Sequence, residues 1–351
     1  MLHILNYLSV YFTERNFKYH VSYYYYMDEL DRKILYEISE NARESHNVLA
    51  RKVRCSREVF DYRLKKLEEK KIIVGYQARI NISNFIYGGY ILLIQTLNLN
   101  KKSEELLLNK VKSNQKTQFI GNIGGEYSSI IGFTTKNIND LYDYINFINS
   151  YFGKSKSKSL LLTMVKEIKD SYKSIFSSLE EPNKIVSMPV ISDKIEIDNI
   201  DKKILLTLGK DATLASWKIA DKTEISEVAI RKRISKLIDS KLILGFRAMI
   251  DPSKLDYQVH DIFIKVNSKS EKDEIELINL FQSSKNVTYA VRTIGEYDFV
   301  IRLLVKNNIE LKNYIQELRN KFPEIISSVV SQPLFETIYH TQLAEEFLEI
   351  N

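Results

Sequence analysis

The chain has 351 residues, 44% hydrophobic and 27% charged, a composition typical of a globular protein with two or more domains. The net charge of +6 permits a polyanionic partner without requiring one. A single cysteine, Cys55, excludes an intrachain disulfide, and the five histidines lack metal-binding spacing, so we expect no cofactor and no metal. No apolar run reaches the ~20 residues that cross a bilayer, so a cytoplasmic protein without a membrane partner is expected.

Residues 1–27 are rich in tyrosine and lack the ordered regions of a secretory signal, which predicts a poorly ordered extension. Apolar periodicity then predicts three helices, at 29–40, 46–53 and 56–70, followed by an alternating strand at 72–81. The connection between the second and third helices is short, as in a helix-turn-helix. Residues 28–82 are therefore predicted to form a first helix-turn-helix domain, with the strand as a wing.

Residues 86–168 show a different alternation of elements. Strands are predicted at 90–97, 117–123, 128–134 and 159–168, and helices at 102–112 and 137–151. This βαββαβ order is the ferredoxin-like arrangement. The stretch 169–197, which contains Pro182 and Pro189, is predicted to be a linker.

The second half of the chain repeats the first at a spacing of 170 residues. For example, Leu30-Asp31 matches Ile200-Asp201, and Gly125-Glu126-Tyr127 matches Gly295-Glu296-Tyr297. We therefore predict a second helix-turn-helix domain at 198–252, a second ferredoxin-like domain at 258–340 and a tail at 341–351. The expected fold class is α+β, with two copies of a winged helix-turn-helix domain followed by a ferredoxin-like domain.

The third helix of each helix-turn-helix is rich in lysine and arginine and follows a serine suited to capping it. In such a helix, outward residues near the N-terminus contact base edges and neighbouring basic residues contact phosphates. A solvated helix face is the alternative, and the helix-turn-helix spacing favours double-stranded DNA as partner. The predicted DNA-binding residues are Ser56, Arg57, Glu58, Tyr62, Lys65 and Lys66 in the first copy, and Ser226, Val228, Arg231, Lys232, Ser235 and Lys236 in the second.

Arg63 and Arg233 lie beside the apolar stripe of these helices and not opposite it. Asp31 and Asp201 occupy equivalent places on the first helices. We expect structural ion pairs between Asp31 and Arg63 and between Asp201 and Arg233. A phosphate contact by either arginine is the alternative that the sequence leaves open.

The turn Gly295-Glu296-Tyr297-Asp298 lies between two predicted central strands. Its N–H groups and the carboxylate of Asp298 suit a small zwitterion, although a plain hairpin turn fits the spacing at least as well. The first copy has Ser128 where the second has Asp298, so its turn is expected to do less. Phosphate-binding loops, dinucleotide-binding glycine motifs and nucleophile elbows are absent from the sequence, and no enzymatic activity is expected.

The repeated unit resembles the Lrp/AsnC (feast/famine) family of transcription regulators. The resemblance is carried by Leu30-Asp31-Arg32-Lys33-Ile34-Leu35, Ala42-Arg43, Leu49-Ala50, Ser56, Arg63, Leu67 and Gly125-Glu126-Tyr127, and in the second copy by Ile200-Asp201, Ser226, Arg233, Leu237, Gly245 and Gly295-Glu296-Tyr297-Asp298. It implies sequence-specific DNA binding, pairing of the sensing domains through their sheets and modulation by an amino acid near the second turn. Gly295, Glu296, Tyr297 and Asp298 are the expected effector-binding residues.

The sequence departs from the family pattern in three places. Lys71 and Lys241 stand where a glycine usually follows the third helix, and Thr213 stands where the first copy has Arg43. Because both copies lie in one chain, we expect an intrachain pseudo-dimer that presents the third helix of each helix-turn-helix domain to DNA. The sequence does not decide whether such chains assemble into further homo-oligomers. Siroheme decarboxylases, which share the architecture, are the enzymatic alternative, and a sensing protein whose helix-turn-helix parts serve only assembly is a third.

Overall fold

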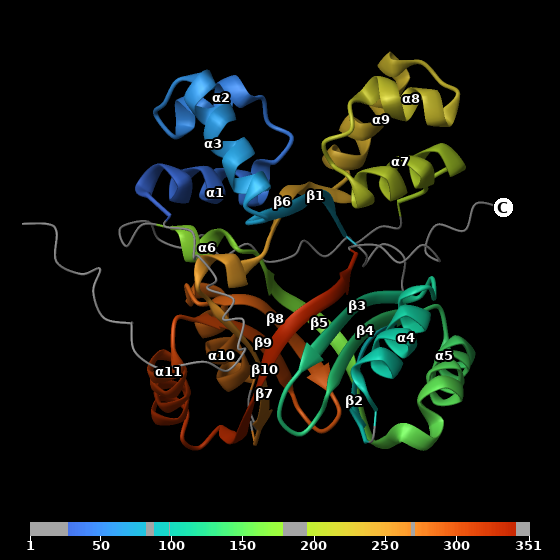
Figure 1. The fold of residues 1–351 in the computed structure, drawn as a ribbon, viewed down its shortest axis with the longest axis vertical. Helices are drawn as coiled ribbons and strands as arrows, with labels where there is room; N and C mark the ends of the chain where they lie inside the picture. Colours follow the sequence, from blue (N-terminus) through green and yellow to red (C-terminus); the bar gives the residue numbers. More distant parts are fainter. Residues whose placement is uncertain (1–26, 82–87, 98, 178–194, 268–270, 342–351) are drawn as a thin grey trace, which may run out of the picture.

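The structure, a computed structural model, describes residues 27–81, 88–97, 99–177, 195–267 and 271–341. It has two layers: two helical units lie above a β-barrel that carries helices on its outside (Figure 1). Except for Met27, the predicted extension lies outside the described residues, and so does the predicted tail except for Thr341.

The first helical unit, which we call head 1, consists of α1 (Glu29–Asn41), α2 (His46–Lys52) and α3 (Arg57–Glu69), followed by β1 (Ile73–Ile80). Each helix begins at a capping side chain, because Asp28, Ser45 and Ser56 accept hydrogen bonds from backbone N–H groups three residues later. After α3 the chain turns through Lys71, whose φ of 58° is left-handed.

The second unit, head 2, has the same order of elements: α7 (Asn199–Lys210), α8 (Ser216–Thr223), α9 (Glu227–Asp239) and β6 (Ile243–Ile250). Asp198 and Ser226 cap α7 and α9 in the same way as Asp28 and Ser56 cap α1 and α3. Lys241 follows α9 with a φ of 61°, the counterpart of Lys71.

Strands β1 and β6 pair antiparallel in a two-stranded ribbon that joins the heads. The pairing is symmetric across the repeat, since Ile73 lies opposite Ile250 and Ile80 lies opposite Ile243. The ends of the two strands are exchanged between the cores: Ala78 and Ile80 pack in head 2, and Ala248 and Ile250 pack in head 1. Each head therefore completes its apolar core with a strand from the other half of the chain.

The lower layer holds two βαββαβ units. The first contains β2 (Gly88–Thr96), α4 (Lys101–Lys112), β3 (Thr117–Ile123), β4 (Ser129–Thr135), α5 (Ile138–Phe152) and β5 (Lys156–Asp170). The second contains β7 (Gln258–Val266), α10 (Glu271–Ser283), β8 (Val287–Ile294), β9 (Phe299–Val305), α11 (Asn308–Lys321) and β10 (Ile326–His340). The predicted α+β class, with helix-turn-helix and ferredoxin-like parts, is confirmed.

The two sheets close into one barrel in the order β10-β3-β4-β2-β5-β8-β9-β7. The long last strand of each unit pairs with the other unit, because β5 lies beside β8 and β10 lies beside β3. Side chains such as Leu93, Phe263 and Val291 fill the inside, and the four barrel helices cover the outside (Figure 1). The strands are thus buried on both faces, which explains their continuous apolar runs.

The beginning of the segment predicted as a linker is built into this fold. Residues 169 and 170 complete β5, and α6 (Lys173–Phe176) follows. Phe176 is buried in the core of head 1, and Arg32 donates a hydrogen bond of 2.9 Å to its carbonyl oxygen. Head 1 is therefore attached to the barrel by packed side chains as well as by the chain itself.

Candidate functional site

The outward face of the third helix is exposed in both heads. In α3 the apolar stripe Phe60, Leu64 and Leu67 faces the core, which leaves Tyr62 66% exposed. In α9 the equivalent stripe turns Val228 outward with 71% of its surface exposed. Large apolar or aromatic side chains exposed on a basic helix face are suited to contact with base edges.

The two serines predicted to contact DNA cap their helices. The hydroxyl of Ser56 accepts a hydrogen bond of 3.3 Å from Val59 N–H, and that of Ser226 accepts one of 3.2 Å from Ala229 N–H. Both serines are exposed at the N-terminus of the third helix, where the helix dipole favours a phosphate.

Several predicted DNA-binding side chains form ion pairs within their own helix. Arg57 Nε lies 3.4 Å from Asp61, Lys65 Nζ lies 3.8 Å from Glu69, and an Arg231 Nη lies 2.6 Å from Glu227. Exposed pairs of this kind contribute ~0.2–0.5 kcal/mol, so the basic groups are free to exchange a carboxylate for a phosphate. Of the others, Glu58, Lys232, Ser235 and Lys236 are exposed, and Lys66 is partly buried.

Arg63 and Arg233 turn inward toward the first helix of their heads. Arg63 Nη1 lies 3.3 Å from Asp31 and 2.6 Å from Asp28. Arg233 Nη1 lies 2.8 Å from Asp201 and 2.7 Å from Asp198. The hydrogen bonds that Arg233 donates to Asp201 and Asp198 raise the pKa of its guanidinium.

Asp28 and Asp198 were not foreseen as members of these ion pairs. Each caps the first helix of its head and accepts a hydrogen bond from the third helix as well. An aspartate directly before a predicted helix is the signal that identifies such a residue.

Arg43 joins the heads on one side only. Its guanidinium donates hydrogen bonds of 2.7 Å and 2.9 Å to the carbonyl oxygens of Ala212 and Leu214 in head 2. The equivalent residue in head 2, Thr213, instead donates hydrogen bonds to Asp211, two residues earlier. The departure from the repeat at Thr213 therefore makes the connection between the heads asymmetric.

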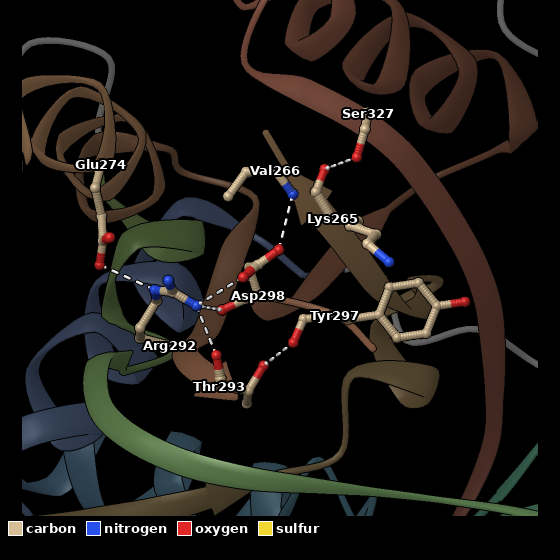
Figure 2. Close-up of polar contacts among 8 residues, drawn as sticks. All are labelled: Lys265, Val266, Glu274, Arg292, Thr293, Tyr297, Asp298 and Ser327. Atoms are coloured by element: carbon tan, nitrogen blue, oxygen red, sulfur yellow. Dashed lines mark hydrogen bonds and ion pairs between the residues drawn. The ribbon is translucent and has the colours of Figure 1, made fainter. Parts of the chain in front are cut away.

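The turn at the end of β8 uses Asp298 to hold strands together (Figure 2). One carboxylate oxygen accepts a hydrogen bond of 2.9 Å from Val266 N–H, and the other lies 3.2 Å from Arg292 Nη1. Arg292 in turn reaches Glu274 on α10 through a bond of 2.9 Å from its Nε. In this structure the carboxylate is thus already paired with groups of its own domain.

Ser128 forms the equivalent strand-end hydrogen bond in the first copy. Its hydroxyl accepts a hydrogen bond of 3.2 Å from Thr96 N–H, and Thr96 is the counterpart of Val266. The counterpart of Arg292 is Asn122, which cannot form the ion pair. The replacement of an aspartate by Ser128 therefore keeps the strand-end hydrogen bond and removes the charges.

The rest of the predicted effector turn lies against the other half of the chain. Gly295 has a φ of 146°, and a Cβ there would come within 2.8 Å of Leu162 on β5. The ring of Tyr297 is buried inside the barrel beside Phe263, with Tyr127 of the first copy in the same cluster. Glu296 remains exposed.

Two exposed basic helices held on a common ribbon, above a pair of ferredoxin-like sheets, define a helix-turn-helix DNA-binding protein. Residues 27–68 match the AsnC-type helix-turn-helix domain. The HTH-type transcriptional regulator FL11 of Pyrococcus horikoshii is 34% identical over 35% of this chain and 80% of its own length. Regulatory protein AsnC of Haemophilus influenzae is 32% identical over 38% of this chain and 87% of its own length. The chain belongs to the Lrp/AsnC family of DNA-binding transcription regulators.

A solved structure shares the architecture over nearly the whole chain. The siroheme decarboxylase NirDL covers 92% of this chain and 96% of its own, with a TM-score of 0.56 and 14% sequence identity. This likeness shows that the two proteins share a fold. Among the described residues, no helix is long and apolar enough to cross a membrane.

Proposed function

We propose that this regulator binds DNA as an intrachain pseudo-dimer. The observation that supports this most directly is the β1–β6 ribbon, whose symmetric register fixes two third helices on one frame. Family regulators that bind as dimers place such helices in successive major grooves ~34 Å apart. One chain with two heads meets this requirement without a second subunit.

The two heads are proposed to read different half-sites. Glu58, Tyr62 and Lys65 face outward in head 1, whereas Val228, Lys232 and Ser235 face outward in head 2. Tyr62 and Val228 would contact base edges, and Lys65, Lys232 and the arginines beside them would contact phosphates. The preferred operator should therefore be an imperfect palindrome.

Selection of binding sites from random DNA tests this assignment. Lys65→Ala and Lys232→Ala should each weaken binding to the selected site. Each should also reduce the slope of log affinity against log salt concentration by about one, because one phosphate contact is lost. Lys312→Ala, an exposed lysine on α11, is the matched control. A perfectly symmetric selected site, or full affinity in both head variants, would refute the proposed reading faces.

The regulator is further proposed to respond to an amino acid, as its family resemblance implies. The ferredoxin-like units are physically continuous with the heads through β5, α6 and the ribbon, so a ligand held there has a route to the DNA-binding layer. Change of operator affinity on addition of each common L-amino acid measures this response.

An enzyme of the siroheme decarboxylase type is the second candidate, because the NirDL fold spans almost the entire chain. The stretches 118–128 and 289–298, where we would expect histidines suited to a tetrapyrrole, contain no histidine. Titration with an iron tetrapyrrole, followed by visible absorbance, separates the candidates. A saturable spectral shift would favour the enzyme, and an unchanged spectrum favours the regulator.

A further inference from the structure

The β1–β6 ribbon lies between the heads and the barrel (Figure 1), and one of its faces is polar. Gln77 and Arg79 alternate with the apolar residues of β1, and Arg247 lies directly opposite Gln77 on β6. Because paired residues of neighbouring strands point to the same side, these three side chains share one face. They are 4%, 6% and 4% exposed, so the face is covered by the layer below it.

Two acids at the end of β5 approach this face. Arg247 Nη1 lies 2.8 Å from Asp170, a hydrogen-bonded ion pair. Arg79 Nη2 lies 3.6 Å from Glu167 Oε1, which is too long for a hydrogen bond. The acids come from the first ferredoxin-like unit only, since their counterparts in the second are Thr337 and His340.

Four buried polar atoms in this junction have no hydrogen-bond partner among the described residues. Three are donors, namely Gln77 Nε2, Arg79 Nε and Arg247 Nε, and the fourth is the acceptor Glu167 Oε1. A buried polar group without a hydrogen-bond partner is destabilising, and native structures have few of them, so four such atoms in one junction require an explanation. A bound molecule with hydrogen-bond acceptors at one end and a donor at the other could pair with all four atoms.

We propose that the junction between ribbon and barrel binds a free α-amino acid. The carboxylate would accept hydrogen bonds from Gln77, Arg79 and Arg247, and the ammonium would donate to Glu167. This inference rests on the amino-acid response proposed above and gives it a site. Gly75, two residues before Gln77 on β1, has no atom within 4 Å of the position that a Cβ would occupy, so the strand is uncrowded next to the donors.

The position of this site explains how binding of an amino acid would affect DNA binding. The three donors belong to strands of both halves, and those strands complete the cores of both heads. The acceptor belongs to the barrel. An amino acid in the junction would therefore tie the ribbon to β5 and shift both heads together. The turn at Asp298 offers no comparable group, because both oxygens of that carboxylate are engaged.

Calorimetric titration of the full chain with each common L-amino acid tests the site, with acetate and methylamine as probes of its two ends. Gln77→Glu is the decisive variant: it is isosteric and places a carboxylate of the protein itself between Arg79 and Arg247. We expect it to fold with an unchanged or higher unfolding temperature and to bind the amino acid at least about tenfold more weakly. Gln316→Glu, the same change at an exposed position of α11, should bind like the wild type.

The outcomes separate the site from the function. Loss of binding in Gln77→Glu with binding retained in Gln316→Glu supports the junction. Undiminished binding in Gln77→Glu overturns it, and if Asp298→Asn then abolishes binding, the amino-acid response stands with its site at the turn. Failure of every amino acid to bind the wild type overturns both, whereas DNA titration without amino acids still tests the reading heads.

Discussion

The guanidinium of Arg43 lies over the ring of Phe246, 5.3 Å from its centroid, and so links the first head to the strand that leaves the second. The same side chain is hydrogen-bonded to two carbonyl oxygens of head 2. The two reading helices are thus held by a brace as well as by the ribbon.

Arg43→Gln should therefore weaken binding to the complete operator more than binding to either half-site. Loss of two hydrogen bonds and a cation–π contact is expected to lower the free energy of unfolding by about 1–3 kcal/mol. Denaturant unfolding and DNA titration measure the two effects. Thr213→Gln, at the equivalent position of head 2, should change neither; equal effects of both variants would contradict a one-sided brace.

Trp217 gives a spectroscopic signal for head 2 alone. It is the single tryptophan of the sequence, is 53% exposed in the first turn of α8, and has the Lys218 ammonium 5.4 Å from its ring. A phosphate that draws Lys218 away should change the fluorescence when head 2 binds. DNA carrying only the half-site of head 2 should produce the change, and Lys232→Ala should shift it to higher DNA concentration. A change caused only by the half-site of head 1 would reverse our assignment of the heads.

Lys71 and Lys241 occupy left-handed backbone positions that glycine adopts without steric cost. Lys71→Gly and Lys241→Gly should each raise the free energy of unfolding by roughly 0.5–1 kcal/mol. Lys70→Gly, one residue earlier with a φ of −78°, should lower it instead. Thermal unfolding of the three variants distinguishes this conformational effect from the loss of a positive charge.

The ionisations of Glu167 and His340 should make the free energy of unfolding depend on pH in opposite directions. Burial, followed by the nearby Asp170, raises the pKa of Glu167 to about 7, so its stabilisation is present below pH 4.5 and is lost as pH rises to 7. Burial, followed by Arg247, lowers the pKa of His340 to about 4, so its stabilisation is present above pH 6.5 and is lost as pH falls to 4.

Single variants should expose each slope. In His340→Gln the free energy of unfolding should fall as pH rises from 5 to 7, by up to about 1.4 kcal/mol per pH unit. In Glu167→Gln it should fall as pH decreases over the same range. Denaturant titrations at several pH values measure both slopes, and parallel profiles for the two variants would show that neither group titrates in this way.

The sequence predicted the helices and strands well because their signals are local. The caps Ser56 and Ser226 and the apolar stripes of α3 and α9 place those helices within a residue of their observed bounds. The alternation in β1 predicted a strand, but the partner of a strand and the core that receives Ile80 depend on contacts far along the chain. The roles of Gln77, Arg79 and Arg247 depend on that pairing and so were not foreseen. Asp298 was predicted from a motif, whereas its engagement by Arg292 follows from the sheet.

The exchange of strand ends in the ribbon means that neither head is an independent module. A chain cut between the repeats would give two fragments, each missing a piece of its hydrophobic core and each carrying the piece that the other needs. Each fragment would then need an equivalent strand from another chain to complete its core. Loss of the second repeat should therefore leave the core of head 1 without Ala248 and Ile250.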